Sequence, residues 1–309
     1  MKISDIPSHF DEPTLIVITG PTASGKSALA IELARRLGTE IISADSRQIY
    51  QGIPIVTAMP SLAEREPVRH HLIDLFPLDR YYSAAEFETD ALSIAGRLLE
   101  ERGSAVVCGG SMMYVDALCN GIDDLPTVPD SIREEMKRLH ETNGDEWLLN
   151  ELKEADPEYY EIVDRKNIKR VIHALEIMRT AGRKYSEMRT GMRKNRSFRI
   201  LKLCTELPRE VLFGRINSRV DEMVIAGLED EARGVYHLRH LNSLNTVGLK
   251  EMFAFFDGKM DRHTAIERIK KNTRVYAKKQ MTWWKRDPEI IPLEVPYACG
   301  CRFEGSSSS

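Results

Sequence analysis

The sequence lacks several features that define whole classes of proteins. Its five cysteines are too few and too scattered for a disulfide framework, and the Cys299-Gly-Cys301 pair has no second pair with which to bind zinc. No apolar stretch is long enough to cross a bilayer, and the opening residues lack the apolar core of a signal peptide. We therefore expect a cytoplasmic protein with reduced thiols that acts as a monomer and has no membrane partner.

The sequence also lacks a large net charge, which is only −3, but its charges are strongly segregated. Residues 165–219 contain 16 lysines and arginines against four acidic residues, a local charge of +12. Residues 262–286 carry nine basic residues against one acid, or +8, whereas residues 141–164 carry nine acids against one lysine, or −8. Such segregation can direct a polyanion to one side of a protein, although solvated helix faces give the same pattern.

The most informative stretch is residues 14–27, Thr-Leu-Ile-Val-Ile-Thr-Gly-Pro-Thr-Ala-Ser-Gly-Lys-Ser. Its apolar run predicts a buried strand and the leucine spacing that follows predicts a helix, so a G-x-x-x-x-G-K-S loop stands between strand and helix. The glycines allow backbone N–H groups to converge on phosphate oxygens. The helix N-terminus, the Lys26 ammonium and the Ser27 hydroxyl add a dipole, a cation and a ligand for Mg²⁺. This stretch predicts a phosphate-binding P-loop.

Two more strand–loop–helix units follow the P-loop. Residues 40–45 read as a strand that runs into a polar loop, and residues 104–108 as a second buried strand before a helix over 112–118. Between them, residues 52–82 look irregular, and a helix over 83–101 begins with a capping box. We therefore predict an α/β fold with a P-loop-type, doubly wound parallel sheet as its core.

The pattern changes to helix alone after residue 122. The length of 309 residues fits one large domain or a domain with an insertion. No β-rich run occurs in 131–189, whereas residues 198–205 return to a strand that is followed by helices as far as residue 286. We expect a core of 1–122 and 197–309 with a mostly helical insertion domain over 123–196. Residues 1–13 are expected to be a loose lead-in and 306–309 a serine-rich tail.

Asp45 is the candidate base. An NTPase needs a second acid at a strand end to hold its metal, but the strand at 104–108 ends in Gly-Gly-Ser, and Asp74 lies in a proline-bounded stretch that we expect to be structural. Asp45 stands at a strand end near the P-loop, followed by Ser46 and Gln48, whose polar groups suit a nucleobase. Its carboxylate could accept a proton from a nucleophile while phosphate leaves, or it could cap a turn.

Two later stretches carry cations. Arg215 and Arg219 are four residues apart on one predicted helix face, where they could bind a diphosphate or pair with surface acids. Residues 273–286 mix cations with tyrosine and tryptophan, a composition common where nucleic acid stacks, although paired tryptophans are more often part of a core.

Several stretches, in order along the chain, resemble one family. They are Gly-Pro-Thr-Ala-Ser-Gly-Lys-Ser (20–27), Ser-Ala-Asp-Ser-Arg-Gln-Ile-Tyr (43–50), Tyr-Ser-Ala-Ala-Glu-Phe (82–87), Gly-Gly-Ser-Met-Met-Tyr (109–114), Arg-Val-Asp-Glu-Met (219–223) with Gly-Leu (227–228), Val-Gly (247–248), and Thr-Arg (273–274) with Ala-Lys-Lys-Gln (277–280) and Thr-Trp (282–283). From about residue 14 to about residue 286, the chain resembles the tRNA dimethylallyltransferases.

The resemblance implies transfer of a dimethylallyl group from dimethylallyl diphosphate to N6 of an adenine, with release of diphosphate. The adenine lies next to the anticodon on its 3′ side, at position 37, in tRNAs that read codons beginning with U. The implied partners are thus the tRNA anticodon stem-loop and dimethylallyl diphosphate, and the implied cofactor is Mg²⁺, bound by Ser27.

The resemblance also implies the site residues. Asp45 would act as the base, with Lys26 and Arg219 as the other catalytic residues. Diphosphate would be bound by Arg219 and by the loop residues Gly20, Pro21, Thr22, Ala23, Ser24, Gly25, Lys26 and Ser27. Contacts to tRNA would come from Asp45, Ser46, Arg47, Gln48, Ser111, Arg133, Lys169, Arg170, Val171, Ile172, His173, Asn245, Thr246, Val247, Gly248, Leu249 and Lys250. The sequence departs from the usual family pattern at Val56, Met59, Met112, His173 and Leu249.

Three other interpretations remain open at this point. A P-loop kinase of a small metabolite would use the same loop and sheet, but it has no need of a basic helical insertion. A prenyltransferase acting on free adenine nucleotides likewise leaves the insertion unexplained. A non-catalytic RNA-binding module would leave Lys26, Ser27 and Asp45 without a role.

Overall fold

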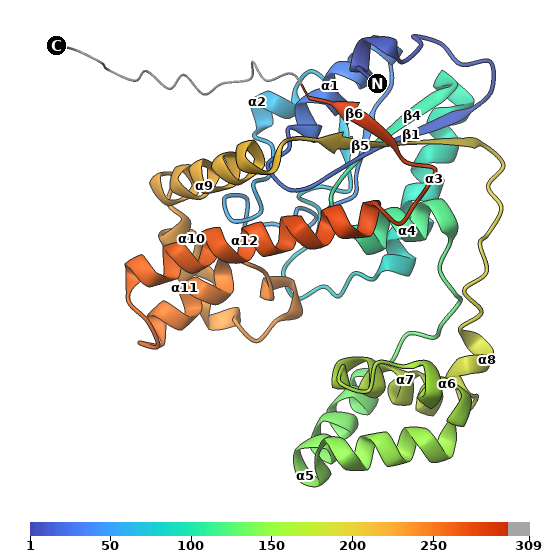
Figure 1. The fold of residues 1–309 in the computed structure, drawn as a ribbon, viewed down its shortest axis with the longest axis vertical. Helices are drawn as coiled ribbons and strands as arrows, with labels where there is room; N and C mark the ends of the chain where they lie inside the picture. The colour runs from blue at the N-terminus through green and yellow to red at the C-terminus, as the bar shows by residue number, and fades with distance from the viewer. Residues whose placement is uncertain (296–309) are drawn as a thin grey trace. The chain divides into compact units, whose positions relative to one another are not determined.

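The computed structural model describes residues 1–295, and the chain in it divides into two compact units (Figure 1). One unit combines Met1–Cys119 with the chain from Arg196 onward, and the other is Asn120–Asn195. The sequence-based boundaries of the insertion, 123 and 196, lie within a few residues of this division.

The first unit is built on a six-stranded parallel sheet. The strand order is β3-β2-β4-β1-β5-β6, and every paired neighbour is parallel. All six residues of β1 are buried, as expected for a central strand covered on both faces. The predicted α/β fold with a parallel sheet is confirmed. The strands are β1 (Thr14–Thr19), β2 (Ile41–Ser43), β3 (His70–His71), β4 (Ser104–Cys108), β5 (Arg199–Glu206) and β6 (Ile291–Glu294).

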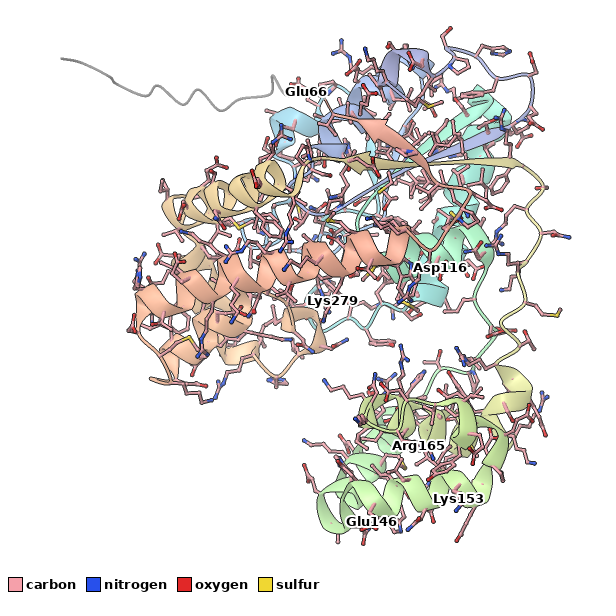
Figure 2. All side chains as sticks on the ribbon, in the orientation of Figure 1. Glu66, Asp116, Glu146, Lys153, Arg165 and Lys279 are labelled. Carbon is pink, nitrogen blue, oxygen red and sulfur yellow. The ribbon has the colours of Figure 1, made fainter. Side chains whose placement is uncertain are left out.

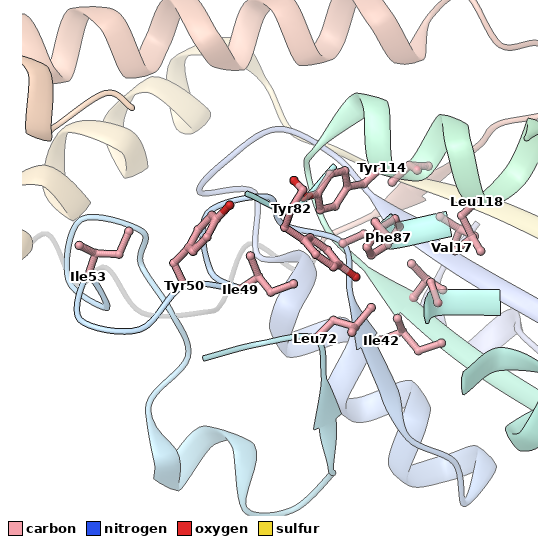
Figure 3. Close-up of a cluster of buried hydrophobic side chains, with 14 of the residues drawn as sticks. Val17, Ile42, Ile49, Tyr50, Ile53, Leu72, Tyr82, Phe87, Tyr114 and Leu118 are labelled. Atoms are coloured by element: carbon pink, nitrogen blue, oxygen red, sulfur yellow. The ribbon is translucent and has the colours of Figure 1, made fainter. Parts of the chain in front are cut away.

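Helices pack on both faces of this sheet. Side chains alternate along β1, so that Leu15 and Val17 belong to one hydrophobic cluster while Ile16 and Ile18 belong to another. Part of the first cluster, including Val17 and the stacked Phe87 and Tyr114 rings, is shown in Figure 3. The helices are α1 (Lys26–Leu37), α2 (Leu62–Arg65), α3 (Ala84–Arg102), α4 (Met112–Asn120), α9 (Arg209–Ile225), α10 (Leu228–Val235), α11 (Leu249–Phe256) and α12 (Arg262–Trp284).

The capping box predicted before residue 84 is present. The Ser83 N–H donates to Glu86 Oε2 at 2.9 Å, and the Glu86 N–H donates to Ser83 Oγ at 3.1 Å. These two bonds satisfy N–H groups at the start of α3 that have no partner within the helix. The start of α3 is therefore encoded locally.

Two expectations about irregular segments are wrong. The first residues are not a loose lead-in, because Ile3 and Ile6 are buried and the Arg36 guanidinium donates to both of their carbonyl groups at 2.8 Å. The stretch 52–82 contains α2 and the two-residue edge strand β3, and the expectation also omitted β6. Such short strands carry almost no periodic signal and form by pairing with a neighbour. Cys299, Cys301 and the serine-rich tail lie outside the described residues.

The second unit is helical throughout. It contains α5 (Asp130–Ala155), α6 (Pro157–Ile162), α7 (Ile168–Ala181) and α8 (Tyr185–Met188), and no strand occurs anywhere in residues 120–195. Its own core gathers around Met136, Leu148 and Val171. Gly182, in the left-handed conformation with φ 65°, ends α7. Among residues 1–295, no helix is long and apolar enough to cross a membrane.

Candidate active site

The P-loop connects the end of β1 to the start of α1. Gly20 (φ 145°) and Gly25 (φ 91°) have positive φ values that suit glycine, and Gly25 is the N-cap of α1. A Cβ atom at Gly20 would lie only 2.0 Å from Thr205 Oγ1 on β5. The strand, loop and helix predicted from residues 14–37 are confirmed.

Two side chains from distant elements hold this loop in place. The Thr205 hydroxyl donates to the buried Ser24 Oγ at 2.6 Å. The Thr22 N–H donates to Gln280 Oε1 at 2.9 Å, so this amide is not available to a phosphate. Neither Thr205 nor Gln280 was assigned a role from the sequence. For Gln280, the only signal was its place in the Ala-Lys-Lys-Gln stretch.

Two adjoining cavities open beside the loop. One has a volume of about 420 Å³ and the other about 90 Å³, and both are lined by Thr22, Asp45, Thr57, Ala58, Arg219 and Tyr276. Lys26 and Ser27 line the smaller cavity. A hollow of about 690 Å³ against Trp284 is larger but contains none of the predicted catalytic side chains. The paired cavities are therefore the candidate active site.

Cations surround the smaller cavity. Burial lowers the pKa of Lys26, and the nearby Arg219 guanidinium lowers it further. Burial also lowers the pKa of Arg219 itself. Arg215, one turn earlier on α9, has its Nη1 3.6 Å from the position that a Cβ of Gly25 would occupy. Cations removed from water in this way gain the most from an anionic partner, so the smaller cavity suits a phosphate or diphosphate.

Asp45 combines both roles considered for it from the sequence. Its Oδ1 accepts the N–H groups of Arg47 at 2.9 Å and Gln48 at 3.2 Å, which makes it the cap of the turn after β2. Within residues 1–295 its other oxygen, Oδ2, accepts no hydrogen bond, and Asp45 lines both cavities. One oxygen therefore fixes the turn while the other is available to a reacting group.

The side chains after Asp45 hold neighbouring loops as well as lining the site. The Ser46 N–H donates to Ser111 Oγ at 2.8 Å, and the Arg47 guanidinium donates to the Asn242 carbonyl at 2.8 Å. Gln48 Nε2 donates to the carbonyl groups of two residues in the loop after Ile53, Thr57 and Ala58, at 3.0 and 3.1 Å. These bonds use the Nε2 group of Gln48, and its Oε1 stays available to accept a hydrogen bond from a base.

The structure brings together most of the predicted tRNA-contact residues of the first unit. The larger cavity is lined by Asp45, Ser46, Arg47, Ser111, Asn245, Thr246, Val247, Gly248 and Lys250. Gln48 lines only the smaller cavity, and Leu249 lines neither cavity, because its side chain is fully buried in the core. A contact between Leu249 and tRNA stays a prediction, and it would have to come from the backbone of this residue.

The remaining predicted tRNA contacts lie in the second unit. Lys169, Arg170 and His173 are exposed on α7, Ile172 is half-buried, and Arg133 is half-buried on α5. Val171 is fully buried in the core of this unit, so its side chain supports the helix and has no surface for RNA. As for Leu249, a contact between Val171 and tRNA stays a prediction that only the backbone of the residue could meet.

The parallel sheet, the glycine-bounded loop before α1 and the half-buried cations beside it define a P-loop phosphate-binding protein. Residues 48–287 match the model of the family described as IPP transferase. The chain belongs to this family, and the resemblance found in its sequence motifs is confirmed.

Relatives at high identity and solved structures agree. The chain is 51% identical over 277 residues to tRNA dimethylallyltransferase 2 of Parabacteroides distasonis, covering 90% of this chain and 93% of the relative. It is 52% identical over 278 residues to tRNA dimethylallyltransferase 1 of Bacteroides thetaiotaomicron, covering 90% of each.

Among solved structures, the tRNA isopentenylpyrophosphate transferase of Bacillus halodurans aligns with a TM-score of 0.66 at 33% identity, covering 93% of this chain and 92% of that one. A eukaryotic dimethylallyltransferase captured acting on tRNA aligns with a TM-score of 0.76 at 28% identity, covering 92% of this chain and 74% of that one.

Proposed function

We propose that this protein transfers a dimethylallyl group from dimethylallyl diphosphate to N6 of an adenine in tRNA and releases diphosphate. The observation that carries the proposal is the meeting of half-buried cations and one unpaired carboxylate oxygen in adjoining cavities beside the P-loop. The relatives named tRNA dimethylallyltransferase support it.

The diphosphate is expected in the smaller cavity. Lys26 and Arg219 line this cavity, and α1 begins there, at Lys26. As the bond from C1 of the prenyl group to the diphosphate oxygen breaks, negative charge grows on that oxygen. Fixed cations and helix N–H groups stabilise this charge without having to reorganise.

The adenine is expected in the larger cavity, where Asp45 Oδ2 is available. N6 forms the new bond to the prenyl carbon and loses a proton, which the Asp45 carboxylate accepts. Ser46 in this cavity would contact the base, and so would the free Oε1 of Gln48 from the adjoining smaller cavity. An adenine in an anticodon loop must leave its stack to reach such a cavity, as in other enzymes that modify bases.

The residues at the site fit Mg²⁺. The Ser27 hydroxyl lines the smaller cavity, and hard oxygen ligands are those that Mg²⁺ prefers. Mg²⁺ is commonly held by one or two protein groups together with substrate phosphates and water, so a small protein ligand set suffices. When bound, the ion would neutralise charge on the leaving diphosphate.

The helical unit is proposed to contact the tRNA through Lys169, Arg170 and His173 on α7, together with Ile172 and Arg133. The target would be the adenine on the 3′ side of the anticodon in tRNAs that read codons beginning with U. We further propose that the protein acts as a monomer in the cytoplasm, where this substrate is found.

The test is incubation of the protein with labelled dimethylallyl diphosphate, Mg²⁺ and unmodified tRNA. Label is expected in the RNA, at the adenine beside the anticodon. Parallel reactions with AMP and ATP as acceptors test the free-nucleotide alternative, and release of phosphate from ATP in the presence of small metabolites tests the kinase alternative. Label in AMP but not in tRNA would refute the proposal.

The basic residues of α7 give a prediction that needs no assay of chemistry. Each phosphate that they neutralise releases counterions, so the logarithm of tRNA affinity falls linearly with the logarithm of salt concentration. Lys169→Ala combined with Arg170→Ala should weaken binding to all tRNAs and reduce this slope by about one to two units. Affinity would be measured by fluorescence anisotropy from low to moderate salt.

Arg97→Ala combined with Arg102→Ala on α3 is the control, since it removes the same charge from a helix with no proposed RNA contact. Binding of dimethylallyl diphosphate should change in neither variant. A slope that stays at the wild-type value in the α7 variant would mean that Lys169 and Arg170 form only a solvated helix face.

A further inference from the structure

Gln280 is a buried amide that joins two loops of the active site. It lies on α12 and is only 1% exposed. Its Oε1 accepts the N–H of Thr22 in the P-loop at 2.9 Å, and its Nε2 donates to the carbonyl of Gly110, after β4, at 2.8 Å. Because a backbone N–H can only donate and a carbonyl can only accept, these two partners fix the orientation of the amide.

The loop after β4 is shaped to receive this side chain. A Cβ atom at Gly110 would lie 2.5 Å from Gln280 Nε2, so only glycine leaves room for the amide. A Cβ atom at Gly109 would lie 2.1 Å from the Ala44 carbonyl oxygen, so the same loop also lies directly against the residue before Asp45.

Hydrogen bonds continue from this loop to the turn that carries the candidate base. The Ser111 N–H donates to the Ala44 carbonyl at 3.2 Å, and Ser111 Oγ accepts the Ser46 N–H at 2.8 Å. An unbroken series of contacts thus runs from the P-loop through Gln280 and residues 110–111 to the Asp45 turn. The Gln280 amide is buried and bonded at both of its polar atoms, and the other members are backbone or the short Ser111 side chain, which leaves little freedom for the spacing to vary.

We propose that Gln280 is a positioning residue for prenyl transfer. Its amide sets the distance between the P-loop, which holds the leaving diphosphate, and the Asp45 turn, which holds the group that accepts the N6 proton. This inference rests on the proposed function and assigns to Gln280 an action through Thr22 and Gly110, on the loops rather than on the reacting atoms.

The reason to expect a large effect is geometric. Transfer requires N6, the prenyl carbon and the leaving oxygen to lie in line, and a displacement of about 1 Å can cost about 10²-fold in rate. A misplaced loop can still bind diphosphate through its cations. Loss of the amide should therefore lower kcat and leave KM nearly unchanged.

Gln280→Met tests this directly, because methionine has a similar length and no group that can pair with Thr22 or Gly110. We expect kcat to fall by about 10- to 100-fold, while KM for dimethylallyl diphosphate and for tRNA stays within about threefold of wild type. The rate would be measured with labelled dimethylallyl diphosphate and saturating tRNA.

Gln280→Glu adds a readout that simple packing would not give. A protonated carboxyl can accept from Thr22 and donate to Gly110, as the amide does, whereas the ionised form places a charged oxygen against the Gly110 carbonyl. The ratio of the variant rate to the wild-type rate should therefore rise as the pH falls. The other titratable or charged groups that line the smaller cavity with Gln280 are Lys26, Asp45, His70, Cys108, Arg219 and Tyr276. Taking the ratio at each pH cancels the pH effects that both proteins share.

Gln51→Glu is the matched control, since it makes the same chemical change on an exposed side chain, and its rate ratio should not vary with pH. Thermal melting would show whether each variant folds. Wild-type kcat in Gln280→Met, a rise in KM as large as the fall in kcat, or a pH-independent ratio in Gln280→Glu would each overturn the proposal. So would loss of the melting transition in both variants, because Gln280 would then hold the fold rather than the loops. Failure of wild-type protein to label tRNA would instead refute the proposed function.

Discussion

Asp45→Asn is expected to lower the rate of transfer to bound tRNA by about 10²- to 10⁴-fold, the range typical of a lost general base. The substitution is a clean one in this structure. Asparagine can keep an oxygen at the Oδ1 position, where it would still accept the Arg47 and Gln48 N–H groups and hold the turn. Only the free oxygen changes, from a group that can take a proton to an amide that cannot.

Single-turnover rates with saturating tRNA, together with tRNA affinity, would separate the two roles of Asp45. Affinity should stay within a few-fold of wild type, because the substitution removes a proton acceptor and leaves the turn in place. Asp74→Asn, which changes an aspartate in the loop after β3, is the control. If affinity fell while the rate on bound tRNA stayed intact, Asp45 would be a positioning residue only.

Lys26→Ala is expected to lower turnover by about 10²-fold or more, because it removes a fixed cation from the leaving diphosphate. The half-buried Lys26 ammonium donates to the Pro21 carbonyl at 3.4 Å, so it is held at the loop. Since burial lowers the pKa of Lys26, binding of diphosphate should also weaken as the pH rises through that lowered value.

Turnover and the affinity for inorganic diphosphate with Mg²⁺ would be measured for this variant. Lys259→Ala, which removes an exposed lysine paired with Asp257, should behave as wild type in both. Near-normal transfer of label by Lys26→Ala would show that the P-loop does not hold the leaving group.

The features that the sequence predicted well are those encoded over short distances. The P-loop needs glycines and a lysine at fixed spacing, and α3 needs only Ser83 and Glu86 to begin where it does. The parallel sheet also followed from local patterns, because strands buried on both faces leave continuous apolar runs such as residues 15–18.

The features that it did not predict depend on contacts between distant residues. Gln280 and Thr205 reach the P-loop from more than 180 positions away, and nothing in the residues around them indicates that contact. Val171 and Leu249 were assigned to RNA contact with their neighbours, yet each turns into a core. A sequence motif identifies a stretch of residues. Which side chains of that stretch can contact a ligand depends on the burial of each one.

The chain leaves the first unit after Cys119 and returns to it at Arg196, and the closeness of these two connections matters for insertion and deletion of the helical unit. The Lys194 N–H donates to the Asn120 carbonyl at 2.8 Å, and the Arg196 guanidinium donates to the carbonyl groups of Ala117 and Leu118 at 2.9 and 3.0 Å. The outgoing and returning backbones are thus adjacent, like the two ends of a hairpin loop. Excising residues 121–193 would leave ends that a short turn can close without disturbing any strand of the sheet. The helical unit is therefore inserted at a single point of the core, where recombination can enlarge, exchange or delete it.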